Sequence, residues 1–362
     1  MRVIYHSFRG HFSDSPRAIY EALARSGRDL EHLWIADPSH RHTFPHNVAT
    51  VMYGSPDCIN ALEAADMLVS NDHLPLDWQK RSETTYLQTW HGTPLKRIHH
   101  DVRWAPAGRL EYLDTDIARW DHLLSPNRAS TPRLREAFGF TGSIFETGYP
   151  RNDILHSPQR HQIGMAIRAD LGVAESKTVV LYTPTWRDNL VFRTHGPGHE
   201  LQLNLTDFVD KLGGDHVLLL RLHSMVADTL NLPSSASVID CSAYPDVRDL
   251  YLAADVLVTD YSSTMFDFAN TGKPILLFTY DLEYYRDVLR GFYFDLQEIA
   301  PGPMLTTSKE VISAIRDIKA WLPTYTARYE TFRRIYCHLE DGHATDRVIK
   351  RFFPTDLASL VT

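Results

Sequence analysis

The chain has 362 residues, of which 43% are hydrophobic and 23% are charged. These proportions are typical of a globular protein, and the length suggests two domains of roughly 150 residues each. Lys and Arg number 37 against 45 Asp and Glu, which gives a formal net charge of −8. The composition therefore excludes a disordered, collagen-like or disulfide-scaffolded chain, and the acidic balance argues against nucleic acid as a partner.

The cysteines and the hydropathy pattern indicate a cytoplasmic protein. Cys58, Cys241 and Cys337 lie far apart and form no Cys-x-x-Cys pair, so we expect reduced thiols. The N-terminus lacks the apolar stretch of a signal peptide, and no run of about 18 apolar residues is present that could span a membrane. Peripheral attachment at the inner face of the cell membrane stays open.

The first half of the chain alternates short apolar runs with helical stretches. Residues 2–7 read as a strand, and a helix follows over 15–27, with Ser15 as N-cap and Gly27 as its stop. Further strands are predicted within 32–37, 61–72, 84–92, 121–127 and 143–153. The segment 97–117 interleaves arginines with aromatic residues, and it reads either as a solvated helix or loop or as an amphipathic element that meets anionic lipid.

A second series of strands follows a polar connector near residues 151–165. The run 178–183 is predicted to be a buried parallel strand, and the region 309–353 is predicted to be mostly helical. Further strands are expected within 215–224, 237–242, 246–263 and 264–281. We therefore expect an α/β protein with two βαβ halves and a cleft between them. Ligands of open parallel sheets bind beyond the carboxyl ends of the strands, so the loops that follow strands should carry the chemistry.

The first candidate is the sequence Thr-Trp-His-Gly-Thr-Pro-Leu-Lys at residues 89–96. His91 sits where an apolar strand ends, and an imidazole can take a proton from an alcohol near neutral pH. A histidine that only makes hydrogen bonds within a loop is the alternative, which the compact motif disfavours. Gly92, Thr93 and Lys96 belong to the same candidate site as His91.

Two further candidates follow strands of the second half. Residues 182–188 carry hydroxyls and a guanidinium that suit a phosphate or nucleotide, although a turn with a surface Arg–Asp pair is also consistent. Residues 218–224 place Arg221 and His223 on one face of a strand end, which suits a pyrophosphate or else a polar edge strand. The residues predicted to bind such a ligand are Thr183, Thr185, Arg187, Arg221 and Ser224.

The strongest local signal spans residues 253–269, where a strand runs into a helix that is predicted to begin near Ser262. Free backbone N–H groups and the helix dipole at such a start favour an anion. Asp267 lies one turn after Ser263, and its carboxylate could accept hydrogen bonds from ribose or glycerol hydroxyls. Serine capping with a surface aspartate is the alternative. The residues predicted to bind such a ligand here are Thr259, Asp260, Ser262, Ser263, Thr264 and Asp267.

Several common sites are missing from the sequence. It contains no P-loop, no Gly-x-Gly-x-x-Gly, no His-Glu-x-x-His and no Gly-x-Ser-x-Gly motif. The histidines lack metal-ligand spacing, so we predict no dedicated metal site and no bound cofactor. Phosphates often bring Mg²⁺, for which the sequence indicates no ligand set.

Taken together and in order, these motifs resemble the CDP-glycerol glycerophosphotransferase family of teichoic-acid and capsule polymerases. The resemblance extends from about residue 65 to residue 350 and rests on segments 91–96, 125–127, 148–153, 182–187, 221–223, 259–263, 267–269, 272–274 and 341–342.

The resemblance implies a GT-B fold, in which two Rossmann-like domains enclose a cleft and a C-terminal helix crosses back to the first domain. We place an acceptor domain at residues 1–155, a nucleotide-donor domain at 156–320 and the C-terminal helices at 321–362. In that family the histidine that corresponds to His91 is the proposed general base, and the one that corresponds to His223 assists at the donor phosphates. By the same resemblance, the serine pair at 262–263 and nearby arginines hold the pyrophosphate. The resemblance thus implies that Gly92, Thr93 and Lys96 lie on the acceptor side and that the candidate residues of the second half bind the nucleotide donor.

The activity that the resemblance implies is transfer of glycerol phosphate from CDP-glycerol, with release of CMP, in cell-wall or capsule polymer biosynthesis. The acceptor is a hydroxyl of a lipid-linked or polymeric saccharide or teichoic acid. Users of CDP-ribitol share these motifs, so a related CDP-polyol stays open as donor. The chain lacks the long N-terminal extension of the larger polymerases, which favours a primase-like member or a single capsule-polymerase module. The alternatives are a GT-B glycosyltransferase that uses a nucleotide sugar, and a catalytically silent module that binds lipid-linked polymer.

Overall fold

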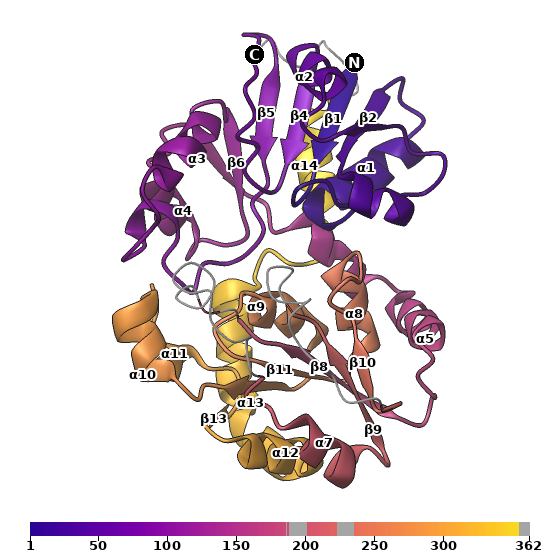
Figure 1. Ribbon diagram of the computed structural model, residues 1–362, viewed down its shortest axis with the longest axis vertical. Coiled ribbons are helices and arrows are strands. Elements are labelled where there is room, and N and C mark those ends of the chain that lie inside the picture. Colours follow the sequence, from indigo (N-terminus) through magenta and orange to yellow (C-terminus); the bar gives the residue numbers. More distant parts are fainter. Residues whose placement is uncertain (186, 188–200, 223–234, 355–362) are drawn as a thin grey trace. The chain divides into compact units, whose positions relative to one another are not determined.

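The chain forms two compact units, each built around one parallel sheet (Figure 1). The structure is a computed structural model that describes residues 1–185, 187, 201–222 and 235–354. Unit 1 comprises Met1–His91, Ala107–Ser157 and His338–Thr362, and unit 2 comprises Gly92–Pro106 and Pro158–Cys337. The segment 97–117 is thus divided between the two units.

Unit 1 contains a seven-stranded parallel sheet in the order β3-β2-β1-β4-β5-β6-β7. Because β1 pairs with both β2 and β4, the strand order reverses at this point, and ligands are expected at the carboxyl ends of these strands. The strands are β1 (Arg2–His6), β2 (Glu31–Ala36), β3 (Thr50–Met52), β4 (Met67–Ser70), β5 (Thr85–Gln88), β6 (His122–Ser125) and β7 (Ser143–Glu146).

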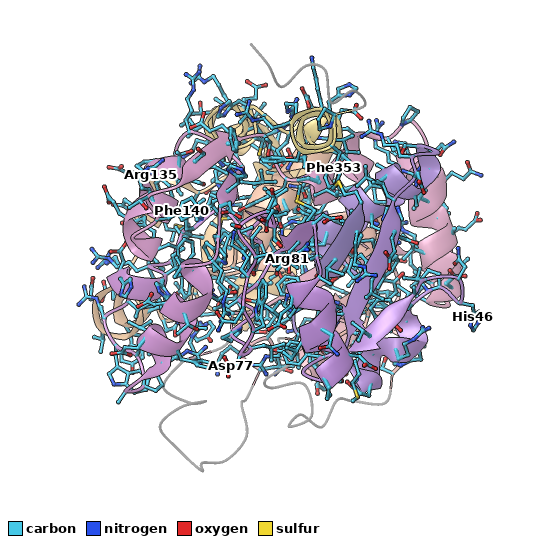
Figure 2. The ribbon with its side chains drawn as sticks, turned by 90° about the horizontal axis from the view of Figure 1, so that it is seen from above. His46, Asp77, Arg81, Arg135, Phe140 and Phe353 are labelled. Carbon is cyan, nitrogen blue, oxygen red and sulfur yellow. The ribbon has the colours of Figure 1, made fainter. Side chains whose placement is uncertain are left out.

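Helices cover the sheet of unit 1 and complete its core. They are α1 (Asp14–Arg25), η1 (Pro38–Thr43), α2 (Pro56–Glu63), α3 (Arg109–Ile117), α4 (Thr131–Phe138), η3 (Pro150–His156) and α14 (Ala344–Phe352). The first helix begins at Asp14 with Ser13 as its N-cap, so the prediction of Ser15 as N-cap was wrong by two residues. Val348 of α14 and the following Phe353 pack into the same core as Val3 and Ile19. Phe353 is labelled in Figure 2.

The loop after β7 attaches the C-terminal helix α14 to unit 1. The carboxylate of Asp153 accepts hydrogen bonds from the backbone N–H groups of Ala344 (2.9 Å) and Thr345 (2.7 Å), and so caps the helix from a distant part of the sequence. The Nε of Arg347 donates to the carbonyl oxygen of Thr147 at 2.9 Å. The 148–153 motif of the sequence therefore has a structural role here.

Unit 2 contains a six-stranded parallel sheet in the order β10-β9-β8-β11-β12-β13. The strands are β8 (Thr178–Thr183), β9 (His216–Leu220), β10 (Val238–Asp240), β11 (Val256–Thr259), β12 (Ile275–Phe278) and β13 (Met304–Leu305). Strand β8 pairs with both β9 and β11, so the order reverses there as it does at β1 of unit 1. Every residue of β11 and β12 is buried, as expected for parallel strands that are covered on both faces.

The helical segments of unit 2 include one long helix, α13, and several short ones. They are η2 (His99–Asp101), α5 (Arg160–Asp170), α7 (Leu205–Leu212), α8 (Val247–Ala253), α9 (Thr264–Phe268), η5 (Ala269–Thr271), α10 (Leu282–Tyr284), the π-helical turn η6 (Tyr285–Leu289), α11 (Leu296–Ile299), α12 (Ser308–Arg316) and α13 (Ile318–Tyr336). Among the helices that the structure describes, none combines the length and the apolar character needed to cross a membrane.

The Gly-Lys-Pro sequence before β12 joins two helix ends. Gly272 has a φ of +72° and ends η5 in the left-handed conformation that glycine adopts readily. The ammonium group of Lys273 donates to the carbonyl oxygens of Leu252 (3.1 Å) and Ala254 (2.5 Å) at the end of α8. Burial lowers the pKa of Lys273 to about 8. The motif therefore fixes α8 and α9 beside each other.

The predicted α/β class is confirmed, since both sheets are parallel and alternate with helices. The three cysteines are buried and form no disulfide, as predicted.

Candidate functional site

His91 follows β5 at the carboxyl edge of the unit 1 sheet and is half-buried. Its Nδ1 lies 2.5 Å from the carbonyl oxygen of Asn71, which follows β4. A carbonyl can only accept, so Nδ1 carries the hydrogen and Nε2 is the basic nitrogen of the neutral ring. The imidazole stacks on Trp90 with ring centroids 4.1 Å apart, and Phe8 lies 5.1 Å away. These contacts hold His91 in a tautomer that suits proton abstraction by Nε2.

The residues after His91 pack with unit 2, although the sequence groups them with the acceptor side. A Cβ atom at Gly92 would lie only 2.6 Å from the Oγ of Ser263, so only glycine allows the loop to approach the turn between β11 and α9. Thr93 is buried, and Lys96 forms an antiparallel bridge with Phe292. Gly92, Thr93 and Lys96 thus belong to the surroundings of the predicted donor-binding turn.

Three threonine hydroxyls meet at the carboxyl edge of the unit 2 sheet. The Oγ1 of Thr183, at the end of β8, lies 3.1 Å from that of Thr259 and 2.9 Å from that of Thr264. The Thr259 hydroxyl also donates to the carbonyl oxygen of Thr183 at 2.7 Å. The Oγ of Ser262 accepts a hydrogen bond from the backbone N–H of Thr264 at 3.3 Å. The structure therefore brings together the hydroxyl groups on β8, β11 and α9 that were predicted from the sequence as site residues.

Helix α9 is shorter than the anion-binding argument assumes. It has five residues, begins at Thr264 and passes into η5, and its N-cap Ser263 makes no side-chain capping bond. So short a helix carries little of the macrodipole that would attract a phosphate. Asp267 lies on this helix and is buried, contrary to the reading of a surface aspartate. The hydrogen-bond donors that this turn can offer an anion are therefore chiefly its hydroxyl groups.

Arg187 and Asp260 connect three loops of unit 2. Asp260 is buried, and its Oδ1 accepts the backbone N–H groups of Thr185 (2.8 Å) and Tyr261 (2.6 Å). The Nη1 of Arg187 donates to Asp260 Oδ2 at 3.0 Å and to the Thr185 carbonyl oxygen at 2.7 Å. The Nε and Nη2 of Arg187 donate to the two oxygens of Asp281 at 2.8 and 2.9 Å. The guanidinium of Arg187 is thus largely occupied by groups of its own unit.

Tyrosine rings enclose this ion cluster. The rings of Tyr261, Tyr280 and Tyr285 have centroids 5.2, 5.0 and 4.8 Å from the guanidinium carbon of Arg187. Burial alone would lower the pKa of Arg187, but Asp260 and Asp281 outweigh it and raise the pKa. Arg187 therefore remains charged, and its contacts are those of a clamp that shapes the loop after β8.

Arg221 follows β9, and its guanidinium is also bonded to the chain. Its Nη1 donates to the carbonyl oxygens of Tyr244 (2.6 Å) and Cys241 (3.2 Å) in the loop after β10, and burial lowers its pKa. His223 and Ser224 lie outside the described residues. The predicted pairing of Arg221 with His223 is therefore not tested.

Three residues of the site went unnoticed in the sequence. Asn71 and Asp281 lie just after β4 and β12, where the rule that ligands meet the carboxyl ends of strands could have found them. Gln88 is the last residue of β5. The apolar pattern of this strand does not indicate that the polar side chain at its end is buried. Each acts through hydrogen bonds to residues distant in the sequence.

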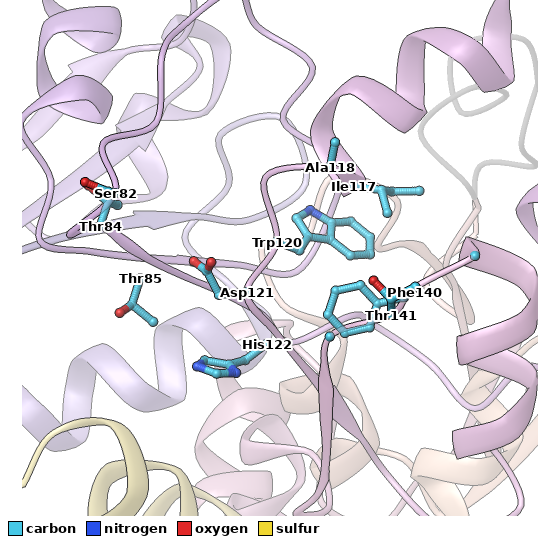
Figure 3. A pocket seen from close by; sticks show the side chains of 12 residues that line it. Ser82, Thr84, Thr85, Ile117, Ala118, Trp120, Asp121, His122, Phe140 and Thr141 are labelled. Atoms are coloured by element: carbon cyan, nitrogen blue, oxygen red, sulfur yellow. The ribbon is translucent and has the colours of Figure 1, made fainter. Parts of the chain in front are cut away.

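Unit 1 contains a pocket of about 580 Å³ (Figure 3). Thr85 and His122 line it and are the first residues of β5 and β6, so it opens at the amino ends of the strands. Its carboxylate, Asp121, is already bonded to the ammonium of Lys80 and to the backbone N–H of Tyr86 at 2.7 Å. The pocket contains none of the predicted site residues.

Comparison with known sequences finds a matching family profile and related proteins whose descriptions agree with it. The family profile described as CDP-Glycerol:Poly(glycerophosphate) glycerophosphotransferase matches residues 1–354. The chain is 38% identical over 365 residues to the teichoic acid poly(glycerol phosphate) polymerase of Bacillus subtilis (strain 168), covering 98% of this chain and 49% of that protein. It is 37% identical to the polymerase of the same description from Bacillus spizizenii, over 96% of this chain and 91% of that protein.

A further relative is the teichoic acid glycerol-phosphate transferase of Staphylococcus aureus, which is 37% identical over 97% of this chain and 92% of that protein. The chain therefore spans about half the length of the Bacillus subtilis relative and nearly all of the other two.

Among solved structures, the wall teichoic acid polymerase TagF matches with a TM-score of 0.88 and 35% identity, over 97% of this chain and 88% of that chain. A UDP-GlcNAc 2-epimerase from Neisseria meningitidis matches with a TM-score of 0.57 and 14% identity over 97% of this chain and 99% of that chain, which is a likeness of fold alone. The GT-B class predicted for the chain, with two Rossmann-like domains, is confirmed.

Proposed function

Because the chain belongs to the CDP-glycerol:poly(glycerophosphate) glycerophosphotransferase family, we propose that it transfers glycerol phosphate from CDP-glycerol to a hydroxyl of a teichoic-acid acceptor and releases CMP. The observation that carries this proposal is the family match over residues 1–354, which includes every candidate site residue. Glycerol is favoured over ribitol as the donor polyol, since relatives named for glycerol phosphate are 37–38% identical and a ribitol-phosphate polymerase is 29% identical.

In the proposed reaction, Nε2 of His91 removes the proton from the acceptor hydroxyl. The acceptor oxygen then forms a bond to the phosphorus that carries glycerol, while the bond from this phosphorus to the bridging oxygen breaks. The bridging oxygen leaves with CMP. Proton transfer of this kind contributes roughly 100- to 10,000-fold in rate. The contact between Nδ1 and Asn71 supports this role, because it leaves Nε2 as the acceptor of the proton.

Unit 2 supplies the groups that bind the donor in this proposal. Hydroxyls near the three-threonine contact, with Ser262 and Ser263, donate to the phosphate oxygens, and Arg221 and His223 add charge. The Oγ1 of Thr185 is buried and has no hydrogen-bond partner among the described residues, which suits a ligand contact. Positioning and charge stabilisation by such groups supply most of the catalysis in phosphoryl transfer.

A donor panel tests the proposal. CMP release is measured with CDP-glycerol and CDP-ribitol, and UDP release is measured with UDP-sugars, each with a polymeric and a lipid-linked teichoic-acid acceptor. We expect acceptor-dependent CMP release, faster with CDP-glycerol than with CDP-ribitol, and no turnover of UDP-sugars. Turnover of UDP-sugars alone would make the chain a glycosyltransferase. Donor or acceptor binding without any turnover would make it a binding module.

We further propose that the protein attaches peripherally to the inner face of the cell membrane, where it meets a lipid-linked acceptor, through one surface of unit 2. The N–H of Arg97 donates to the carbonyl oxygen of Gly291 at 3.1 Å, so the segment after Lys96 runs beside the end of η6. Trp104, Tyr284 and Val288 are exposed on these segments. Arginines beside exposed aromatic and aliphatic side chains suit a surface of anionic lipid.

Vesicle binding tests the attachment. In co-sedimentation with vesicles that contain phosphatidylglycerol, the double variant Trp104→Ala/Val288→Asp is expected to bind at least about 10-fold more weakly than the wild type, because apolar contact is lost and charge repulsion is added. Met52→Asp is the matched control, since Met52 is an equally exposed residue of unit 1. Equal binding by the wild type and both variants would exclude this surface.

A further inference from the structure

Gln88, the last residue of β5, is a fully buried polar side chain three residues before His91. Its Oε1 accepts the backbone N–H of Trp90 at 2.9 Å, and its Nε2 donates to the carbonyl oxygen of Asp72 at 3.2 Å. A backbone N–H can only donate and a carbonyl can only accept, so these partners fix the orientation of the amide. Gln88 thus joins the turn after β5 to the turn after β4.

The turn after β5 needs this support. Trp90 has a φ of +54°, a left-handed conformation that costs a bulky residue on the order of 1–3 kcal/mol. The hydrogen bond from its N–H to Gln88 stabilises this conformation. With the backbone turned in this way, the Trp90 ring packs against Phe138 with centroids 4.6 Å apart and stacks on the imidazole of His91. The conformation of Trp90 therefore determines the direction in which His91 leaves the strand.

The turn after β4 determines the tautomer of His91. The carbonyl oxygen of Asn71 is the partner of His91 Nδ1, and the next carbonyl, that of Asp72, is the partner of Gln88. The backbone N–H of Phe8 donates to the Asn71 side chain at 3.1 Å and holds this turn from a third loop. The buried amide of Gln88 therefore supports two turns. One is the turn after β5, which carries His91, and the other is the turn after β4, whose Asn71 carbonyl orients the His91 ring.

We propose that Gln88 is a positioning residue for His91: its amide holds the Trp90 and Asn71 turns so that Nε2 of His91 is presented to the acceptor hydroxyl. The inference rests on the proposed transferase function for its kinetic consequence, but not for its structural one. Gln88 touches no substrate in this role, and its effect passes through the imidazole. In the competing interpretation, Gln88 only stabilises β5 and does not position His91.

Kinetics of the full-length protein separate the two roles. Gln88→Met keeps the length of the side chain and loses both hydrogen bonds. We expect the kcat for CMP release to fall about 100-fold, as a displacement near 1 Å can cause, with the KM for CDP-glycerol changed less than about twofold. Thr84→Val is the matched control, because it removes a buried hydrogen bond (Thr84 Oγ1 to the Ala65 carbonyl oxygen, 2.6 Å) near the amino end of the same strand. The control is expected to lower the Tm and leave kcat unchanged.

The second readout does not depend on activity. In ¹⁵N-histidine spectra of the intact protein, with His91 assigned by the spectrum of His91→Gln, the wild type should show the Nδ1–H tautomer and Gln88→Met a mixture of both. A lower Tm with kcat and tautomer unchanged would overturn the proposal. If Gln88→Met does not fold, Gln88→Glu, which retains the acceptor for Trp90, replaces it in both measurements. Absence of CMP release by the wild type would refute the proposed function, and the spectra would still test Gln88.

Discussion

Replacement of His91 by alanine is expected to lower the kcat for CMP release by roughly 100- to 10,000-fold, the contribution of a single general base. In the proposed reaction the acceptor hydroxyl then has no group to take its proton, whereas the hydroxyls of unit 2 that are proposed to bind the donor are unchanged. Steady-state measurement of CMP release gives kcat. Calorimetric titration with CDP-glycerol gives the donor Kd, which we expect to change less than about twofold.

His46→Ala is the control for this experiment, since His46 is an exposed histidine of the same unit (Figure 2). It should behave as the wild type does in both measurements. Near wild-type turnover by His91→Ala would show that another group accepts the proton, and an equal loss of donor binding would move His91 to the donor side.

Replacement of Arg187 by methionine is expected to destabilise the protein by about 3–5 kcal/mol, because it leaves buried carboxylates without their cationic partner. Arg187 and Asp260 are nearly inaccessible, at 8% and 2% side-chain exposure, and Asp281 is mostly buried at 19%. Urea denaturation followed by tryptophan fluorescence measures the change. The loops after β8, β11 and β12 should loosen together, since each supplies one partner of the cluster.

The exposed pair Arg316–Asp317 provides the matched control. Arg316→Met removes an arginine of the same chemistry at 61% side-chain exposure, and its urea midpoint should stay close to that of the wild type. The comparison also separates two roles of Arg187. If Arg187→Met retains the wild-type stability and only weakens CDP-glycerol binding, Arg187 binds the donor phosphate directly and is not a clamp.

Local sequence patterns were sufficient to predict most of the strands, but not the short edge strands β3 and β13. Runs such as 178–183 and 275–278 are apolar because parallel strands are covered on both faces, and a threonine stands at the end of the first run (Thr183) and directly after the second (Thr279). His91 and the threonines at 183 and 259 were found by this rule. The rule is useful because ligand-binding residues of open parallel sheets generally lie just beyond the carboxyl ends of the strands.

Contacts between distant segments could not be predicted in this way. The sequence gives no sign that Gly92 approaches Ser263, or that Arg187 is bonded to Asp281, since these pairs depend on how separate loops fold together. The length of α9 was also missed, because the apolar pattern of 264–269 does not distinguish a full helix from a single turn followed by η5. The residues that position the site are therefore harder to predict than those that form it.

The attachment of α14 has a consequence for the order in which the protein is made. Val348 and Phe353 belong to the core of unit 1, yet the ribosome synthesises them after all of unit 2. The strands of unit 1 therefore emerge with part of their apolar interior uncovered, and it stays uncovered until α14 leaves the exit tunnel. Nascent chains of this protein should consequently depend on chaperones while unit 2 is being made, and a stop codon that removes α14 should damage the unit whose strands were made first.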